Sequence, residues 1–299
     1  MPRHLSLASL PLLGAHVSVA GGLPRAFERA EALDCRAIQI FVKNANRWQA
    51  PALGDDEAAA FRAAWRASRV GPAIAHASYL INLAARDAAI LARSEAALAD
   101  EMTRCRALGL DGLVVHPGAH LGAGEEAGIA SVAAAVDRVL AAVPAGPTRL
   151  LLENTAGQGT VLGHRLEHLA AIRARVAAPE RVGFALDTCH AFAAGYAIHR
   201  RAGYEAFVAD VERLLGLPQL GAWHLNDSVR EFGSRRDRHA HVGEGRIGER
   251  PFGWLLRDRR FAGVPMVIET ETDPDLAGHR RDLETLRRLA AEPPRRAPC

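Results

Sequence analysis

The sequence predicts an α/β fold of the (β/α)8 TIM-barrel type, formed by most of its 299 residues. Short apolar runs occur eight times, and Ala-rich amphipathic segments lie between them, as in buried parallel strands that alternate with covering helices. The chain also lacks a GxGxxG turn after its first apolar run and has no Walker A sequence. Eight such units favour a closed barrel over an open doubly wound sheet.

The expected strands are short runs of apolar residues, which is typical of strands buried on both faces. In chain order they lie at residues 12–19, 37–42, 72–78, 112–116, 149–153, 182–187, 221–226 and 265–270.

Amphipathic helices are expected between these strands, for example at residues 23–33, 55–68, 88–108 and 204–215. Gly109 and Gly216 directly follow two of them. Glycine at this position commonly ends a helix because it tolerates a left-handed backbone.

No linker divides the chain, so we expect residues 1–290 to form one domain and the Pro-rich residues 291–299 to form a flexible tail. No run of roughly 20 uncharged apolar residues is present, which argues against a membrane span. The N-terminus lacks a small-residue cleavage site, and the four cysteines show no paired spacing. We therefore expect a cytoplasmic protein with reduced thiols, among which Cys189 is interpreted as a small buried residue.

Histidines and carboxylates collect at or just after the C-terminal ends of the expected strands. In a (β/α)8 barrel these ends converge on one face, where active sites are built. Taken singly, each has an ordinary explanation as a hydrogen-bonded histidine, a helix cap or an ion-pair partner. Burying so many together is costly unless a cation compensates. The residues concerned are His76, His116, Glu153, Asp187, His190, His224, Asp237, His239 and Glu269.

Imidazole and carboxylate donors without thiolates suit zinc or manganese, and zinc is preferred where histidine dominates. Nine donors are too many for one tetrahedral ion but fit about two or three ions. Paired divalent ions suit phosphate ester hydrolysis because they activate water and stabilise the attacking and leaving oxygens. The formal charge of +3 is small, but six arginines lie between residues 230 and 250. These arginines could bind phosphate, although a salt-bridged, solvated loop would explain them too.

Five segments resemble the endonuclease IV family of apurinic/apyrimidinic endonucleases: SYLINLA, ENTAGQG, DTCHAFAAGY, HLNDS and DRHAHVGEG. The resemblance extends over nearly the whole chain, from Gly14 to Thr270. It implies a (β/α)8 barrel that holds three Zn²⁺ ions per chain, with Mn²⁺ as an alternative at one site. It also implies a monomeric DNA-repair enzyme that cleaves duplex DNA 5′ to abasic sites, leaving a 3′-hydroxyl and a 5′-deoxyribose phosphate.

The resemblance carries specific roles onto matching positions. Glu153 would bridge the first two ions, and Glu153 and Glu269 would be the catalytic carboxylates. Asp187, which ends the sixth strand, would complete the second set of ligands. The three sets are His76, His116 and Glu153; Asp187, His224 and Glu269 together with the bridging Glu153; and His190, Asp237 and His239.

DNA contacts are also implied by the resemblance. Tyr79 and Leu80 match a loop that inserts into the duplex at the lesion, where such side chains can fill the gap left by a missing base. In the segment KNANRW the family usually has arginine where Asn46 stands, and Arg47 follows one residue later. Either residue could therefore serve in lesion insertion, and Arg238 could contact a phosphate. Packing of Tyr79 and Leu80 beneath their loop is the ordinary alternative.

Two other functions fit parts of the pattern. A sugar isomerase or epimerase on the same barrel would need one divalent ion held by Glu153, Asp187, His224 and Glu269, and the fold alone does not exclude it. Such an enzyme would leave the other five candidate ligands without a purpose. A non-catalytic damage-binding protein descended from a nuclease is the second alternative, and the complete set of ligands argues against it.

Overall fold

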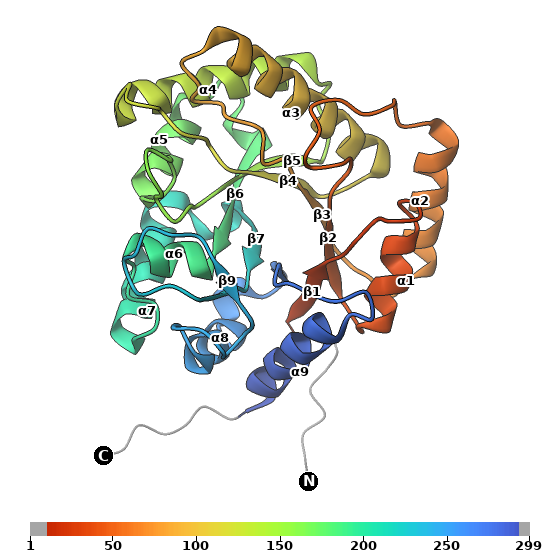
Figure 1. The fold of residues 1–299 in the computed structure, drawn as a ribbon, viewed down its shortest axis with the longest axis vertical. Helices are drawn as coiled ribbons and strands as arrows, with labels where there is room; N and C mark the ends of the chain where they lie inside the picture. Colours follow the sequence, from red (N-terminus) through yellow and green to blue (C-terminus); the bar gives the residue numbers. More distant parts are fainter. Residues whose placement is uncertain (1–10, 293–299) are drawn as a thin grey trace.

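The computed structural model describes residues 11–292 and contains a closed barrel of eight parallel strands (Figure 1). Each of the first seven strands pairs with its neighbours in chain order, and the last strand closes the barrel between the seventh and the first. The predicted (β/α)8 barrel is therefore confirmed. The strands are β1 (Leu12–His16), β2 (Ala37–Ile40), β3 (Ala73–His76), β4 (Gly112–Val115), β5 (Arg149–Glu153), β6 (Val182–Asp187), β7 (Leu220–His224) and β10 (Pro265–Ile268).

The helices lie outside the ring of strands and cover their outer faces (Figure 1). Two helices, α6 and α7, follow β6. The others are single helices between consecutive strands or after the last one. The described helices are α1 (Arg25–Ala32), α2 (Asp55–Ala67), α3 (Ala88–Leu108), α4 (Glu125–Ala142), α5 (Leu166–Arg175), α6 (Thr188–Ala194), α7 (Arg201–Asp210), α8 (Glu249–Leu256) and α9 (Ala277–Ala291).

Helix ends follow the local sequence. Asp87 caps α3 because its carboxylate accepts the N–H groups of Ala89 and Ile90 at 2.8 and 3.0 Å. Gly109 ends α3 with φ of 81°, as expected for a glycine after a helix. The segment predicted as a helix at 204–215 begins earlier, at Arg201, and its last part, Val211–Leu215, is a π-helical turn.

The inside of the barrel is filled by a small apolar cluster beneath the strand ends. Leu151 lies at its centre, and three glycines on β4, β6 and β7 make room for it. A Cβ at Gly112, Gly183 or Gly221 would lie 2.6–2.9 Å from the methyl groups of Leu151. The barrel is therefore a packed core, and its mouth is the place left for polar chemistry. The cluster consists of Ile74, Val114, Leu151, Ala185 and Ala222.

Several expected strands are longer than the observed ones. The first ends at His16 rather than at residue 19, and the last ends at Ile268 rather than at residue 270. The residues beyond these ends turn away into loops that carry candidate site residues. Helix α9 continues to Ala291, and most of the predicted tail at 291–299 lies outside the described residues. Within residues 11–292, no helix combines the length and the apolar character that a membrane crossing requires.

Candidate metal centre

The predicted ligands meet at the C-terminal mouth of the barrel. His76, Glu153, Asp187 and His224 are the last residues of β3, β5, β6 and β7, and Glu269 follows β10 directly. Because all eight strands are parallel, these ends share one face. The first four side chains are almost fully buried, so the site places charged groups where solvent cannot stabilise them.

Glu153 is the hub of the site, because its fully buried carboxylate lies among four imidazole rings. The distances are 3.2 Å to His76 Nε2, 2.9 Å to His116 Nε2, 3.4 Å to His190 Nδ1 and 2.8 Å to His224 Nδ1. Burial alone would raise the pKa of Glu153. The charges of His224 and His116, with hydrogen bonds from His116 and His190, hold that pKa well below its usual range.

Three histidines are oriented by hydrogen bonds to neutral oxygens. Nδ1 of His76 donates to the carbonyl of Ala77 at 2.7 Å, and Nδ1 of His190 donates to that of Asn154 at 2.9 Å. Nε2 of His224 donates to the side-chain oxygen of Gln39 at 2.8 Å. The other nitrogen of each ring then faces a carboxylate, so it carries either a proton or a metal ion. This is how metal-binding histidines are commonly held.

A group of four donors joins β5, β6, β7 and β10. Asp187, His224 and Glu269 offer ligand atoms that lie, with one from Glu153, within 4.8 Å of one another. Burial alone would lower the pKa of His224, but the charges of Glu269 and Glu153 raise it to about 9. The carboxylates thus draw positive charge into this pocket. Asn226 steadies the group by donating to Asp187 at 2.6 Å and to Glu269 at 3.2 Å.

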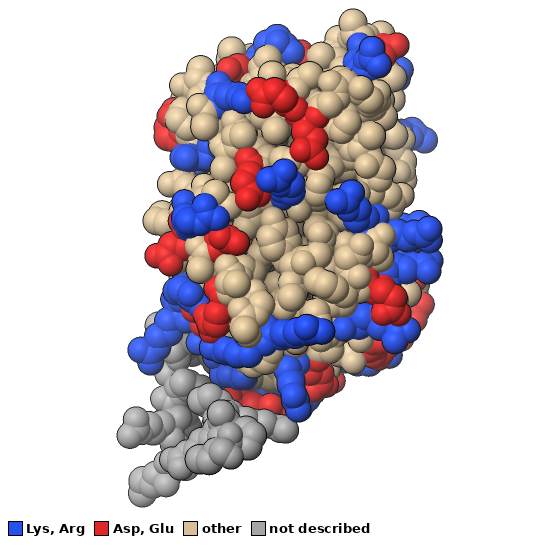
Figure 2. Space-filling model, turned by 90° about the vertical axis from the view of Figure 1, so that its left-hand side faces the viewer, with Lys and Arg blue, Asp and Glu red and all other residues tan. Residues whose placement is uncertain are grey.

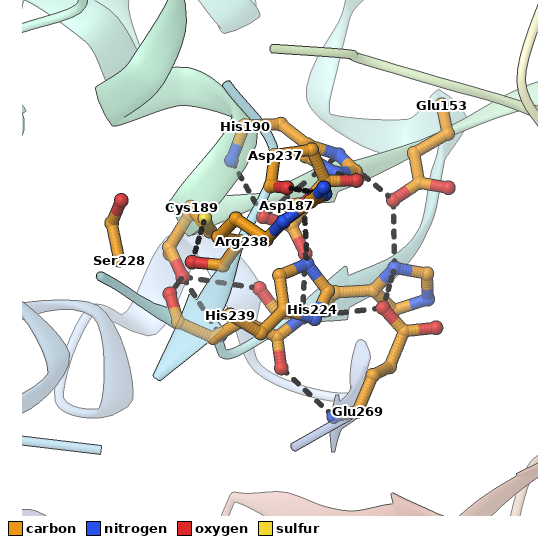
Figure 3. Close-up of polar contacts among 12 residues, drawn as sticks. Glu153, Asp187, Cys189, His190, His224, Ser228, Asp237, Arg238, His239 and Glu269 are labelled. Atoms are coloured by element: carbon orange, nitrogen blue, oxygen red, sulfur yellow. Dashed lines mark hydrogen bonds and ion pairs between the residues drawn. The ribbon is translucent and has the colours of Figure 1, made fainter. Parts of the chain in front are cut away.

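A third group lies on the side of α6 and contains Asp237 and His239 from the long loop after β7. Figure 3 shows their side chains gathered around that of His190. His190 Nε2 lies 3.0 Å from one Asp237 oxygen, and His239 Nε2 lies 3.2 Å from the other. Asp187 Oδ2 is 3.8 Å from His239 Nε2, which is buried and makes no hydrogen bond. His190, Asp237 and His239, which form the third predicted set, therefore lie together. The approach of Asp187 to His239 connects this set to the second one.

A short antiparallel hairpin explains how a distant loop reaches the mouth. Its strands are β8 (Asp227–Ser228) and β9 (His239–Ala240), and Ser228 pairs with His239. The fully buried carboxylate of Asp227 accepts four backbone N–H groups from residues 243–248. Asp227 therefore organises this loop.

Asp187 and Cys189 test the ordinary structural explanations, which are a helix cap for Asp187 and a small buried residue for Cys189. Asp187 caps α6 by accepting the N–H of His190 at 2.7 Å, while its other oxygen faces the site, so the two roles coexist. Cys189 is buried in the first turn of α6, and burial, aided by the charge of Asp187, raises its pKa to about 12. Its sulfur also lies within 4.8 Å of ligand atoms of Asp237 and His239, while its full burial agrees with the interpretation of Cys189 as a small buried residue.

Sequence reasoning missed Gln39, which lies on β2 and is fully buried beneath the site. Its amide nitrogen donates to Glu269 Oε1 at 2.6 Å and lies 3.0 Å from His16 Nδ1. Its oxygen accepts from His224. One amide thus orients ligands on two strands. The available signal was a polar residue in the middle of the apolar run AIQIFV.

The residues expected to contact DNA lie around the same mouth. Asn46 and Tyr79 line a cavity of about 910 Å³ that also reaches Glu269, whereas Arg47 is exposed outside its lining. Tyr79 is 64% exposed, which contradicts simple packing beneath its loop, while Leu80 is half-buried.

The surface charge gathers locally. Arg238 is exposed and donates to the carbonyl of Asp237 at 2.6 Å, which puts a cation beside the third group. Figure 2 shows one outer side of the molecule. Acidic and basic side chains are mixed in the upper part of this view, and basic side chains form a band in its lower part. The chain has a single lysine, Lys43, and its side chain is 2% exposed. The basic surface is therefore made almost wholly of arginine.

A further group of possible ligands, which the sequence analysis did not single out, lies between α4 and α5. Glu125 faces His164 at 3.7 Å and His168 at 3.2 Å. The N–H of Gly163 donates to Nδ1 of His168, so Nε2 of this ring carries the proton and cannot bind a metal while it does so. This group therefore joins two helices through polar contacts of Glu125 with the two rings.

Comparisons with known proteins agree with this geometry. A sequence profile of the family described as "Xylose isomerase-like TIM barrel" matches residues 27–289. The fold and the site thus define a TIM barrel of the xylose isomerase-like class. The probable endonuclease 4 of Chloroflexus aurantiacus is 48% identical over 280 residues, which cover 94% of this chain and 98% of that protein. The crystal structure of endonuclease IV from Thermus thermophilus matches with a TM-score of 0.83 at 38% identity, covering 93% of this chain and 98% of that one.

The chain belongs to the endonuclease IV family, and it is a metal-dependent nuclease. A D-tagatose 3-epimerase-like protein matches with a TM-score of 0.67 at 17% identity, covering 93% of this chain and 98% of that one. At that identity the likeness shows a shared fold alone.

Proposed function

We propose that this nuclease hydrolyses the phosphodiester bond on the 5′ side of abasic sites in duplex DNA, leaving a 3′-hydroxyl and a 5′-deoxyribose phosphate. The observation that best supports it is the meeting of nine donors in adjoining groups that share Glu153 and Asp187. A phosphodiester in its transition state carries charge on several oxygens, and a cluster of cations matches that distribution better than a single ion does.

Three Zn²⁺ ions, with Mn²⁺ able to replace zinc at one position, fit the donors in this proposal. Glu153 would be shared between the first two sets of ligands. His76 and His116 complete the first set, and the other two sets are those described above. When bound, such ions supply hydroxide near neutral pH and offset charge on the attacking and leaving oxygens.

The protein's own part in the reaction is to hold the donors and admit the substrate. Gln39 and Asn226 each donate a hydrogen bond to the carboxylate of Glu269 and so orient its two oxygens. Burial of Glu153 removes water that would screen its charge. The open cavity beside Glu269 gives a backbone phosphate access to the donors from the side of Tyr79.

Lesion recognition is assigned in this proposal to two loops, those after β2 and β3. Tyr79 is exposed at the mouth, with its ring 5.6 Å from those of Phe41 and His76. It is thus placed to stack where a base is missing. Leu80 would pack beside it. Asn46 rather than Arg47 would fill the gap in the duplex, because Asn46 lines the same cavity. Arg238 would contact a phosphate.

A sugar isomerase or epimerase is the alternative that the fold leaves open. The four donors it would use, Glu153, Asp187, His224 and Glu269, are all in place. However, His76 and His116 also converge on Glu153, and the third group adjoins Asp187. A single-ion sugar enzyme has no use for these additional donors.

The test is cleavage of a labelled duplex that carries one abasic analogue, with metal content measured on the same preparation. An intact duplex and a chelator-stripped sample are the controls. We expect one incision 5′ to the lesion, lost on stripping and restored by Zn²⁺, with about three metal ions per chain. Equal cutting of both duplexes would refute abasic specificity. No incision, with about one ion per chain, would favour the sugar enzyme, and aldoses and ketoses would then be assayed.

A further inference from the structure

The loops after β2 and β3 are held together by a buried pair of opposite charges. Lys43 lies in the first loop, and its side chain is 2% exposed. Glu101 lies on α3, and its side chain is 1% exposed. Lys43 Nζ is 3.2 Å from Glu101 Oε1, and the other oxygen of Glu101 accepts the backbone N–H of Ser78 at 3.0 Å. One carboxylate therefore connects a side chain of the first loop to the backbone of the second.

The ammonium group of Lys43 also holds its own loop in shape. It donates to the carbonyl of Trp48 at 3.0 Å and to Asp100 Oδ2 at 3.3 Å. Two acceptors thus take hydrogen bonds from this ammonium group, and Glu101 lies beside it as the partner of an ion pair. A compact ammonium can meet acceptors in three directions, which a planar guanidinium cannot. This geometry favours lysine over arginine at position 43, although every other Lys or Arg position in the chain is arginine.

Further contacts extend the connection between the loops. The hydroxyl of Ser78 donates to the carbonyl of Ala45, which lies next to Asn46. The same hydroxyl accepts the N–H of Leu80 at 3.2 Å. On α3, Arg104 donates to the carbonyl of Pro51 at 2.6 Å. The segments 43–51 and 78–80 are therefore fastened both to α3 and to each other.

Removing two charged groups from water costs free energy, and the attraction within a buried pair seldom exceeds that cost. General stability is thus a weak reason for its presence at this point of the fold. What it does fix is the relative position of Asn46 and Tyr79, which line one cavity. Preformed loops do not have to be ordered when a ligand binds, so affinity is gained without any new contact.

We propose that Lys43 and Glu101 are positioning residues that lock the two DNA-facing loops into one unit before the substrate arrives. The part that concerns DNA rests on the proposed function. The coupling of the loops is a property of the free protein and can be measured without substrate.

The test uses the double variant Lys43→Met/Glu101→Gln, which removes both charges and so leaves neither one buried alone. The matched control is Arg25→Met, which breaks a pair with Glu28 that is more than half exposed. Hydrogen–deuterium exchange of segments 43–51 and 77–82 is compared among the three proteins, together with kcat and KM on the abasic duplex. Ser78→Ala, which removes the contact to Ala45, serves as a second variant if the double variant folds poorly.

We expect exchange to accelerate in both segments together, with no change in the control. KM should rise on the order of tenfold, because several side chains must then be ordered on binding, while kcat at saturating duplex stays unchanged. Faster exchange in one segment alone, or in neither, would overturn the coupling. A fall in kcat at constant KM would overturn the positioning role. If the wild-type protein fails to incise the abasic duplex, the proposed function is wrong, and the exchange data still decide the coupling.

Discussion

Replacing Gln39 with leucine tests whether an amide beneath the candidate metal centre positions its ligands. Gln39 is fully buried and contacts Glu269 at 2.6 Å and His224 at 2.8 Å. Leucine has a similar volume but can make neither contact. Glu269 and His224 would then each lose the group that fixes their orientation, while the surrounding packing is retained.

The magnitude follows from the orienting role of Gln39, and the free energy of one hydrogen bond to a charged group sets its scale. A hydrogen bond to a charged group contributes about 1.5–3 kcal/mol, and a factor of ten in rate corresponds to about 1.4 kcal/mol. Removing a group that orients metal ligands typically lowers metal affinity or activity about 10- to 100-fold. For Gln39→Leu we therefore expect kcat/KM on an abasic duplex to fall by about 10- to 100-fold.

The assay is steady-state cleavage at fixed metal concentration, with metal content and thermal unfolding measured on each protein. Gln219→Leu is the control, because Gln219 precedes β7 at the opposite end of the barrel. Its activity should equal that of the wild type. Wild-type kcat/KM and metal content in Gln39→Leu would refute the positioning argument. So would equal losses in the two variants.

Three further changes test other parts of the site. Glu269→Gln should nearly abolish cleavage while leaving the protein folded, and near-normal turnover would remove Glu269 from its role. Tyr79→Ala should weaken binding to an abasic duplex more than to an intact one, and an equal loss on both would mean that the ring does not sense the lesion. Asn46→Ala should impair abasic binding more than Arg47→Ala, and the reverse order would assign insertion to Arg47. In chelator-treated protein, His224 has a pKa raised from 6.5 to about 9 by Glu269 and Glu153. Its stabilisation is therefore complete below pH 6.5 and lost as the pH rises through about 9, so the unfolding temperature should fall across this window. A flat profile would contradict the assumed charges.

The sequence was informative where side chains sit on strands. In a parallel barrel, a residue at or near the C-terminal end of a strand lies at the mouth, so Glu153 and Asp187, which end their apolar runs, and His76 and His224, which lie near the ends of theirs, could be placed there. Their assignment to sets of ligands depended on the family resemblance, because sequence spacing does not fix distances across a barrel. The structure brings the predicted sets together, and metal binding by them stays a proposal.

Positions that depend on long-range geometry were harder to foresee. Gln39 lies within an apolar run, and only the register of β2 against β1 and β3 directs its amide to the centre. The pairing of Lys43 with Glu101 joins residues that are far apart in the chain, across a helix whose rotation is set by packing. Helix boundaries were predictable where a cap was present, as for α3, but the π-helical turn after α7 has no such local signal.

The donors that distinguish a nuclease from a sugar enzyme on this fold lie partly on the barrel, as His76 at the end of β3 does, and partly on the segments that follow the strands. The four donors from β5, β6, β7 and β10 would serve either chemistry. His116 comes from the end of β4, and Asp237 and His239 come from a loop that the β8–β9 hairpin directs back to the mouth. Asp227 holds the segment that follows this hairpin by accepting four backbone N–H groups. Without that anchor Asp237 and His239 would not reach His190, and only the first two sets of donors would remain at the mouth. A buried carboxylate with no direct part in the chemistry thus helps to decide which chemistry the barrel can support.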